Sequence, residues 1–329
     1  MKNILLICGG GSSEHEVSLL SANYIYDVLK ESKDLKVFKI EITKNGDRVD
    51  QNGELCELRK AGEIHYPKSG NTHKLDFAIP CIHGPPGENG IIQSIFELMG
   101  LPYLGVRPEA SQTCFNKVST KLWMDALDID NTPYVFLGRN DKENLNKADL
   151  FFETYSDVYV KAASQGSSVG CYHVTSKDKL HDKISEAFQL SEFVLIEKTQ
   201  IARELEISVY EKNGEIHASS PGEIICPDGF YTYEEKYSKQ SNTQTHIVAK
   251  NITEKQDRDM KEMAIKAFTG LKLRHLSRVD FFLTNEGQIY INEINTFPGM
   301  TPISMFPKMM ENDGLLFKDF LENIINSST

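Results

Sequence analysis

The sequence has no long apolar run. Residues 4–8 are apolar, but five such residues are too few for a signal-peptide core or a membrane span, and a buried strand explains them better. No other stretch approaches the eighteen consecutive apolar residues typical of a membrane helix. We therefore expect no membrane partner.

Paired cysteines and basic charge are also scarce. No Cys-x-x-Cys pair occurs, which argues against a disulfide framework or a zinc site and favours the reducing cytoplasm. Lys and Arg number 36 against 47 Asp and Glu, a net charge of −11, which excludes nucleic acid as the main partner. A local basic pocket for a small anion stays open. The six scattered cysteines are Cys8, Cys56, Cys81, Cys114, Cys171 and Cys226.

The order of predicted elements indicates an α/β fold. A chain of 329 residues suggests two or three domains. Within residues 1–100, strands alternate with helices, which predicts a parallel sheet covered by helices. The predicted strands there are 4–8, 37–42 and 77–82, and the predicted helices are 17–30 and 90–99.

Two further segments follow, and we expect domains at 1–100, 101–190 and 191–329. Residues 194–198, 206–210 and 215–218 are typical of consecutive antiparallel strands. The polar, Tyr-rich stretch 227–245 predicts a long loop. The other predicted elements are a helix at 116–127, strands at 135–137 and 158–161, a helix at 254–270, a hairpin, and a helix after Gly314.

The hairpin carries an unusual set of polar residues. Residues 278–302 read RVDFFLTNEGQIYINEINTFPGMTP. Because side chains alternate between the faces of a strand, Arg278 and Asp280 share a face, and Glu293 and Asn295 share a face. Oxygen ligands from Asp, Glu and Asn suit Mg²⁺, completed by phosphate oxygens and water.

The turn decides whether the two acids meet. If residues 286–287 form the turn, Asp280 pairs directly with Glu293, and two carboxylates that close need a cation between them or a retained proton. A one-residue slip would send them to opposite faces. A solvated hairpin face with scattered charges is the alternative interpretation.

A second stretch delivers a lysine to a small-residue loop. Residues 158–161 form a strand pattern ending in Lys161, and the Gly/Ser loop 164–170 follows. Small residues let backbone N–H groups approach phosphate oxygens, and the lysine adds a point charge. The Gly-Lys-Ser/Thr signature is missing, so this is not a Walker A loop. Taken alone, such a Gly/Ser loop is more often a plain connection.

Three weaker stretches complete the set. Residues 194–198 end in Glu-Lys, and this strand end would serve as a hinge whose backbone binds an adenine edge, with the carboxylate on a ribose.

Residues 9–18 open a helix with glycines, but the Gly-x-Gly-x-x-Gly spacing fails, which disfavours a dehydrogenase. Glu14 there would hold an ammonium group or complement the helix dipole. His83 follows the strand 77–82, at the ligand-binding edge of a parallel sheet.

In this order, the motifs resemble those of the ATP-grasp ligases and, among them, the D-alanine–D-alanine ligases. The resemblance covers essentially the whole chain. One departure is Ala162, since the family commonly has proline after the lysine. The matching segments are GGxSxEHEVS at 9–18, IHGPPGENG at 82–90, QGSSVG at 165–170, EEKYS at 234–238, RVDFF at 278–282 and NEINTFPGMTPISMFP at 292–307.

The resemblance implies a three-domain ATP-grasp architecture and a reaction. Two D-alanines would be ligated at the cost of ATP through an acyl phosphate, giving ADP and phosphate, for peptidoglycan precursor synthesis in the cytoplasm. A homodimer through the N-terminal domain is implied as well. The alternatives are a D-alanine–D-lactate or D-alanine–D-serine ligase and, in a different class, a non-catalytic nucleotide-binding module.

The resemblance also implies a role for each site residue. Two Mg²⁺ or Mn²⁺ ions would be held by Asp280, Glu293 and Asn295. The residues that would bind ATP are Lys117, Lys161, Ser168, Glu197, Lys198, Glu204 and Lys236. The catalytic residues would be Glu14, Ser167, Tyr237, Arg278 and Gly299. The substrate-binding residues would be Ser18, His83, Ser304 and Met305.

Within these sets, Glu14 would hold the ammonium of the first D-alanine, and Arg278 with the Gly299 amide would stabilise the oxyanion. The stretch 227–245 would be a lid. Tyr237 would lock it through hydrogen bonds to Glu14 and Ser167. Because ligases that use D-lactate lack a tyrosine at this point, Tyr237 favours a dipeptide product.

Overall fold

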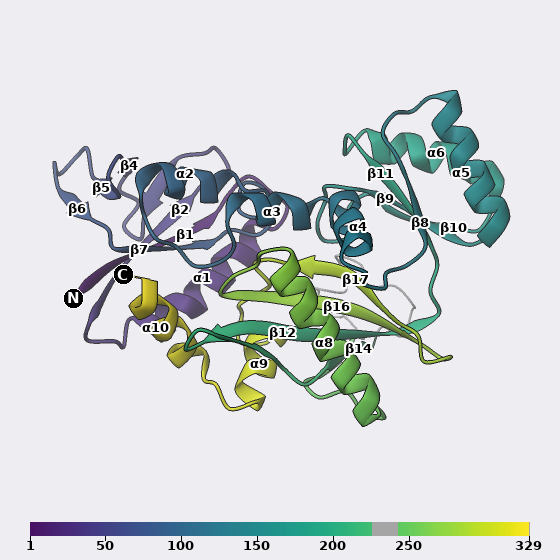
Figure 1. Ribbon diagram of the computed structural model, residues 1–329. Coiled ribbons are helices and arrows are strands. Elements are labelled where there is room, and N and C mark those ends of the chain that lie inside the picture. Colours follow the sequence, from purple (N-terminus) through teal and green to yellow (C-terminus); the bar gives the residue numbers. More distant parts are fainter. Residues whose placement is uncertain (226–242, 329) are drawn as a thin grey trace.

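The computed structural model describes residues 1–225 and 243–328 (Figure 1). It is a mixed α/β structure, as predicted, with three larger sheets and a small antiparallel one. Lys236, Tyr237 and most of the predicted lid lie outside the described residues. Within the described residues, no helix is both long and apolar enough to cross a bilayer.

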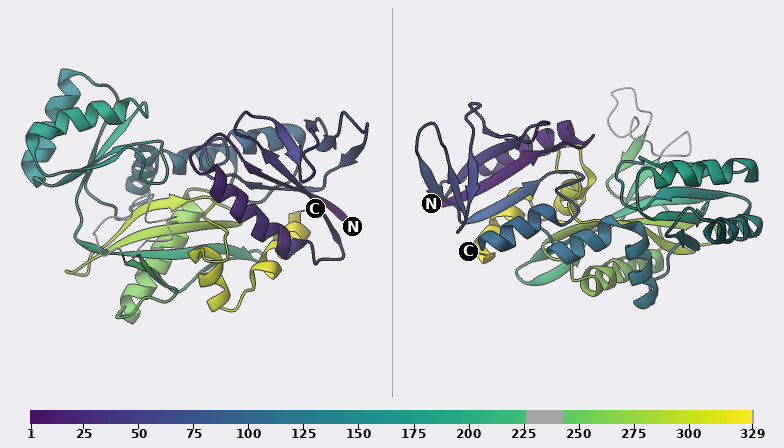
Figure 2. Two further views of the ribbon diagram at one scale, coloured as in Figure 1. Left: turned by 180° about the vertical axis from the view of Figure 1, so that it is seen from behind. Right: turned by 90° about the horizontal axis from the view of Figure 1, so that it is seen from above.

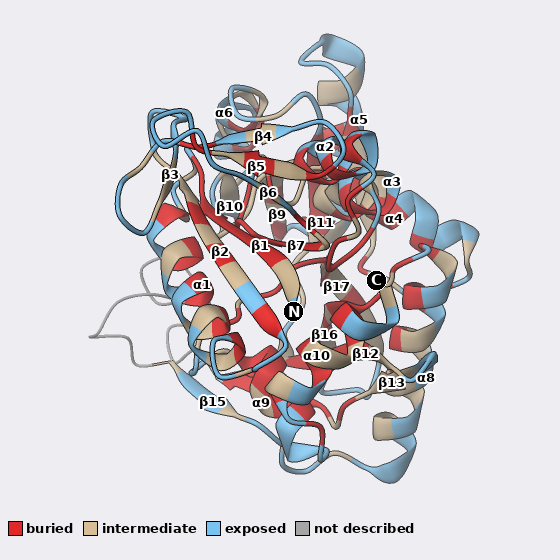
Figure 3. Cartoon of the chain, turned by 90° about the vertical axis from the view of Figure 1, so that its left-hand side faces the viewer, coloured by how far each residue is buried: buried red, intermediate tan, exposed pale blue. Residues whose placement is uncertain are grey.

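The N-terminal sheet has the strand order β3-β2-β1-β7, and β1 pairs in parallel with β2 and β7, as predicted. Alternate residues of β1 enter two cores: Ile4 and Leu6 face helices α1 and α10, while Leu5 and Ile7 face α2. Since both faces are covered (Figure 3), the strand is apolar and buried from Ile4 to Cys8. The elements are β1 (Lys2–Gly9), α1 (His15–Leu29), β2 (Leu35–Ile42), β3 (Arg48–Asp50), β7 (Phe77–Cys81) and α2 (Ile91–Met99).

A small antiparallel sheet, not predicted, separates β3 from β7. Its strand order is β4-β5-β6. Each strand has three residues, which is too short for an alternating pattern to be recognised in the sequence. The strands are β4 (Glu57–Arg59), β5 (Glu63–His65) and β6 (Thr72–Lys74).

The middle sheet is antiparallel, with the order β10-β9-β11-β8. Helices α5 and α6 pack on one face, and α4 packs on the other through Val118. The prediction that 194–198 continues into the following strands was wrong, because β11 pairs with β8 and β9 and not with β12. The elements are α3 (Pro108–Phe115), α4 (Lys117–Ala126), β8 (Tyr134–Leu137), α5 (Lys142–Tyr155), β9 (Val158–Ala162), β10 (Cys171–Val174), α6 (Lys177–Phe188) and β11 (Val194–Lys198).

The C-terminal sheet has the order β15-β14-β12-β16-β17, with β13 paired to β12. Helix α8 packs on its apolar face together with α3. A capping box of Thr253 and Gln256 fixes the start of α8, and its extent matches the predicted 254–270. The elements are β12 (Ala202–Lys212), β13 (Glu215–Ala218), β14 (Gly222–Ile225), β15 (Gln244–His246), α8 (Glu254–Gly270), β16 (Leu276–Thr284) and β17 (Ile289–Asn295).

The β16–β17 hairpin has the predicted pairing of Asp280 with Glu293, but its loop differs from the predicted one. The loop has three residues rather than two: Thr284 pairs with Gln288 around it, and Gly287 adopts a φ of 86°. That loop alone would shift the register by one residue. A bulge restores it, because Asn292 is the extra residue on β17, and Asp280 lies opposite Glu293 as predicted.

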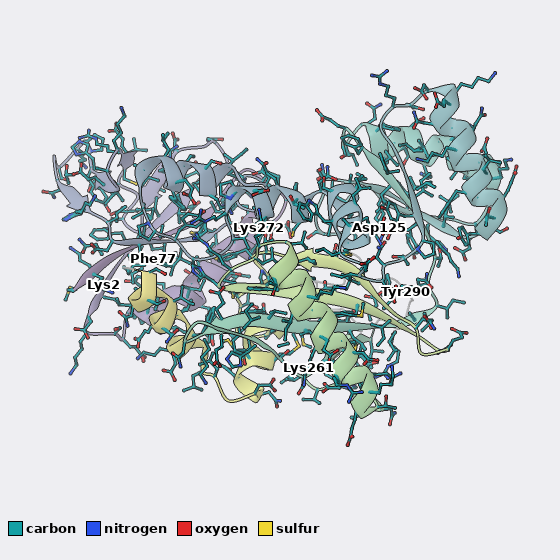
Figure 4. All side chains as sticks on the ribbon, in the orientation of Figure 1. Lys2, Phe77, Asp125, Lys261, Lys272 and Tyr290 are labelled. Carbon is teal, nitrogen blue, oxygen red and sulfur yellow. The ribbon has the colours of Figure 1, made fainter. Side chains whose placement is uncertain are left out.

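The last two helices return to the N-terminal sheet. Helix α9 (Met305–Asn312) was not predicted. It contains Pro307, which lies in the first turn, where its missing N–H costs no helical hydrogen bond. Helix α10 (Phe317–Ser328) packs beside β1 and α1 (Figure 2), and Lys2 Nζ donates to Asn326 Oδ1 at 3.1 Å. Phe77 of β7, marked in Figure 4, is fully buried in the same core.

This packing predicts that α10 holds the N-terminal sheet in place. Phe320→Ala should lower the melting temperature by several degrees, because removing a fully buried aromatic side chain costs about 3–5 kcal/mol. Differential scanning calorimetry measures the shift. The control is Leu316→Ala, which alters a side chain that is 58% exposed and should change little. Equal shifts for both variants would contradict the proposed packing role.

Candidate active site

A lysine on the helix that packs on the middle sheet faces an acid of the C-terminal sheet. Lys117, the first residue of α4, donates from Nζ to the Gln165 carbonyl at 2.7 Å. The same Nζ lies 4.0 Å from Glu293 Oε2 on β17. Lys117 therefore bridges the Gly/Ser loop and the acidic hairpin.

The polar face of the hairpin is built around Arg278. Its guanidinium donates to both carboxylate oxygens of Asp280, each at 2.7 Å, and Asn295 Nδ2 donates to Asp280 Oδ2 at 3.0 Å. Glu206 Oε1 on β12 lies 3.2 Å from Arg278 Nε. Burial opposes the charged form, but Asp280 and Glu206 outweigh it and raise the pKa of Arg278 well above its usual value.

Asp280, Glu293 and Asn295 fit a magnesium or manganese site. Among the described residues, no three His, Cys, Asp or Glu side chains gather as a metal centre. The hairpin instead offers two opposed carboxylates and one amide, which suits an ion that takes most of its remaining ligands from phosphate and water. Because Arg278 binds both Asp280 oxygens here, a cation on Asp280 would either share that carboxylate with Arg278 or displace it.

Lys161 on β9 ends in a buried ionic cluster. Its Nζ lies 2.5 Å from Glu197 Oε2, and Lys121 Nζ on α4 lies 2.6 Å from Glu197 Oε1. Thr132 donates from Oγ1 to Glu197 Oε1 at 2.9 Å. Burial raises the pKa of Glu197, but the two ammonium groups outweigh it and hold that pKa well below its usual value. The Glu197 carboxylate is therefore fully engaged within the protein.

The next residues of the predicted ATP set lie near this cluster in sequence. Lys198 ends β11, and its Nζ lies 5.7 Å from the centre of the Tyr155 ring. Glu204 is half-buried on β12, opposite Phe282.

The Gly/Ser loop after β9 has a left-handed backbone. Ser167 and Ser168 have φ angles of 50° and 61°, and Gly170 has 68°. Such angles in non-glycine residues cost about 1–3 kcal/mol each and are often found at ligand sites. The Ala162 N–H donates to the Gly170 carbonyl at 2.8 Å, a hydrogen bond that the family's usual proline cannot make.

The residue before α1, Glu14, contributes a further carboxylate to the site. Ser167 Oγ donates to Glu14 Oε1 at 2.5 Å, so two of the three residues expected to form the lid network lie together although they are far apart in sequence. Space around Glu14 is tight: a Cβ atom on Gly84 or on Gly166 would lie 3.2 Å from Glu14 Oε2. The third predicted member of this network, Tyr237, lies outside the described residues.

His83 is buried beside Glu14. Its backbone N–H donates to Ser18 Oγ at 2.8 Å, and its ring Nε2 lies 3.0 Å from Ser21 Oγ. Burial lowers the pKa of His83, with a smaller opposing effect from Glu14. The imidazole is therefore neutral at neutral pH.

The loop after β17 contains the remaining predicted residues. Ser304 Oγ accepts a hydrogen bond from the Thr301 N–H at 3.0 Å, and a Cβ atom on Gly299 would lie 3.0 Å from that oxygen. The Met305 side chain is buried against Ile224, so only its backbone is available to a ligand.

Three acidic or basic residues of the site were not predicted. Lys121 and Glu206 sit in elements whose pairing the sequence does not reveal. Glu88 lies within the IHGPPGENG segment, where an acid among glycines and prolines was a usable signal. Its Oε2 accepts from the Gly84 N–H at 3.0 Å, and burial, followed by Glu14, raises the pKa of Glu88 to about 8.

Two antiparallel sheets that present lysines and acids to each other define the ATP-grasp class, consistent with the solved structures of similar fold. A D-alanyl-alanine synthetase A from Vibrio cholerae superposes with a TM-score of 0.94 at 51% identity, covering 99% of this chain and 98% of that one. The VanG D-Ala:D-Ser ligase from Enterococcus faecalis gives 0.88 at 27% identity, covering 100% and 99%.

Sequence relatives narrow the class to one family. The families described as D-ala D-ala ligase N-terminus and C-terminus match residues 3–106 and 123–326. A D-alanine--D-alanine ligase from Vibrio parahaemolyticus is 53% identical over 330 residues, covering 100% of this chain and 99% of that protein. This chain belongs to the D-alanine–D-alanine ligase family.

The raised pKa of Glu88 predicts a pH-dependent stability. The pKa of an unfolded Glu is about 4.3, so the folded state binds the Glu88 proton more tightly than the unfolded state does. The stability gained from this proton is present at low pH and is lost as pH rises towards about 8. Glu88→Gln removes this titration. The melting temperature of the variant minus that of the wild type should therefore increase from pH 5 to pH 9. The exposed Glu31→Gln serves as control. A constant difference across this range would contradict the assignment.

Proposed function

We propose that this protein is an ATP-dependent ligase that joins two D-alanines into D-alanyl-D-alanine for peptidoglycan precursors, in the cytoplasm. The observation that carries the proposal is the direct pairing of Asp280 with Glu293, facing Lys117 across the site. Similarity to dipeptide ligases over nearly the full length of both chains supports the same conclusion.

In the proposed first step, the carboxylate of one D-alanine attacks the γ-phosphorus of ATP, and the bond to ADP breaks. Phosphoryl transfer requires positioning and neutralisation of charge more than covalent help. Lys117, Lys161 and the Ser168 amide would bind the phosphates. Two divalent ions held by Asp280, Glu293 and Asn295 would supply further positive charge.

In the second step, the amine of another D-alanine attacks the acyl phosphate carbon, and phosphate leaves. Arg278 and the Gly299 amide would stabilise the oxyanion of the tetrahedral intermediate. Ser304, with the Met305 backbone, would bind the carboxylate of the attacking D-alanine. Glu14, locked by Ser167, would hold the ammonium of the first one.

The remaining assignments complete the proposal. Because the Glu197 carboxylate is engaged by two lysines, we assign the adenine edge to the backbone of Glu197 and Lys198, and the ribose to Glu204. Ser18 and His83 would line the first D-alanine site. Residues 227–245, with Lys236 and Tyr237, would close over the phosphates and exclude water.

We also propose a division into three domains along the expected 1–100, 101–190 and 191–329, with β11 added to the second domain because it pairs with β8 and β9, and a homodimer formed through the first domain. ATP would then lie between the second and third domains.

A D-alanine–D-serine ligase is the second candidate, because VanG shares the fold with a TM-score of 0.88. A D-alanine-D-alanine ligase from Coxiella burnetii is hardly more similar, at 28% identity, so identity at this level does not separate the two substrates. The support for D-alanine as the second substrate comes from the relatives that are 51–53% identical, which are named for D-alanine alone. Tyr237, within EEKYS, argues against D-lactate as the second substrate, because ligases that use D-lactate lack a tyrosine at this point.

The product should be D-alanyl-D-alanine when D-alanine competes with D-lactate and D-serine at equal concentration. Mass spectrometry of the reaction mixture with ATP and Mg²⁺ identifies it. A depsipeptide or a D-alanyl-D-serine product in excess would replace the proposal with the second candidate or its D-lactate counterpart. No phosphate release with D-alanine alone would reject it.

Glu293→Ala should abolish measurable turnover, because it removes one of the two carboxylates proposed to hold the divalent ions. The loss should exceed about 10³-fold in kcat, comparable to the several kcal/mol that a catalytic metal supplies. Phosphate release at saturating ATP and D-alanine measures it. Retained activity would show that the metal assignment is wrong.

A further inference from the structure

The ionic cluster around Glu197 contains one carboxylate and two lysines. Glu197, on β11, receives Lys121 on one oxygen at 2.6 Å and Lys161 on the other at 2.5 Å. A neutral pair would need only one lysine. The cluster therefore carries a surplus of one positive charge inside the protein.

Of the three charged groups in this cluster, Lys161 is the most exposed. Lys121 is 1% exposed and Glu197 is 3% exposed, and Lys121 is held further by Thr132 Oγ1 at 2.7 Å. The side chain of Lys161 is 14% exposed, and Glu293 of the acidic hairpin acts on its charge. Lys161 is therefore the member of the cluster that faces the site.

Helix α4 sets this arrangement. Lys117 and Lys121 are four residues apart and so lie on the same face of the helix. Lys117 reaches the Gly/Ser loop, and Lys121 reaches under the sheet to Glu197. One turn beyond, Asp125 continues this face at the exposed end of α4 (Figure 4), where it accepts hydrogen bonds from Tyr134 and Asn131. Its charge also acts on Lys121, but less than that of Glu197 does.

Stability alone does not call for the second lysine. Burying an ammonium group is costly, and the attraction of a partner repays this only partly. Burial accordingly lowers the pKa of Lys121 despite its contact with Glu197. A lysine that is costly to bury and unnecessary for charge balance requires another explanation.

We infer that Lys121 is a positioning residue for ATP: by neutralising Glu197 from the buried side, it leaves the charge of Lys161 available to the phosphates. This inference deepens the proposed function and rests on its assignment of Lys161 to ATP. Without Lys121, Lys161 and Glu197 would form a neutral pair, and the phosphates would lose a cation although Lys161 remains.

The test is nucleotide binding rather than turnover. Isothermal titration calorimetry with Mg·ATP, in the absence of D-alanine, should give a Kd at least tenfold weaker for Lys121→Met than for the wild type. In steady-state assays, the KM for ATP should rise likewise, while kcat at saturating ATP and the KM for D-alanine change less than threefold. Lys142→Met removes an exposed charge in the same domain and should leave all four values unchanged.

A double variant separates positioning from simple structural support. In Lys121→Met/Glu197→Gln, the carboxylate is gone as well, so Lys161 is free again. Its Kd for Mg·ATP should return to within threefold of that of Glu197→Gln alone. Additive losses, or wild-type affinity in Lys121→Met, would overturn the inference. Circular dichroism and melting temperature confirm that each variant is folded.

The two proposals fail in distinguishable ways. If the wild type binds Mg·ATP but makes no dipeptide, the proposed function fails, while the affinities still decide the role of Lys121. If the wild type makes dipeptide and Lys121→Met binds Mg·ATP normally, only the inference about Lys121 fails.

Discussion

Repulsion between two carboxylates on neighbouring strands is the constraint on which the site depends. Asp280 and Glu293 lie opposite each other on one face of a hairpin whose other face is apolar core. Like charges so placed destabilise a sheet unless cations compensate. Arg278 compensates Asp280 and Lys117 approaches Glu293, so the basic groups around the hairpin are the electrostatic counterpart of its acids.

The bulge on β17 is what makes this pairing possible. With the three-residue loop and no bulge, Glu293 would point into the core that Ile291 and Ile294 now share. The two isoleucines are three residues apart, which breaks strict alternation and was a readable sign of the bulge. The sequence therefore predicted which side chains meet, but it did not predict the loop, because a compensating irregularity gives the same pairing.

Local patterns predicted the elements better than their partners. Helix α8 has the predicted bounds, and the parallel pairing of β1 with its neighbours followed from element order. Strand β11 was placed in the wrong sheet, since its pairing with β9 is a long-range contact that neither strand encodes alone. Lys121 and Glu206 were missed for the same reason: a charged residue becomes informative only once its burial and its partner are known.

The site is complete only because distant segments converge on it. Ser21 of α1 links His83 to the loop after β17, since its Oγ lies 3.0 Å from His83 Nε2 and accepts from the Met300 N–H at 3.4 Å. The shared core of α1, β1 and α10 fixes that junction. The Glu14–Ser167 hydrogen bond then ties the N-terminal domain to the Gly/Ser loop. Displacing the N-terminal sheet would move Glu14, Ser21 and His83 together, so its packing against the C-terminal helices bears directly on the geometry of the site.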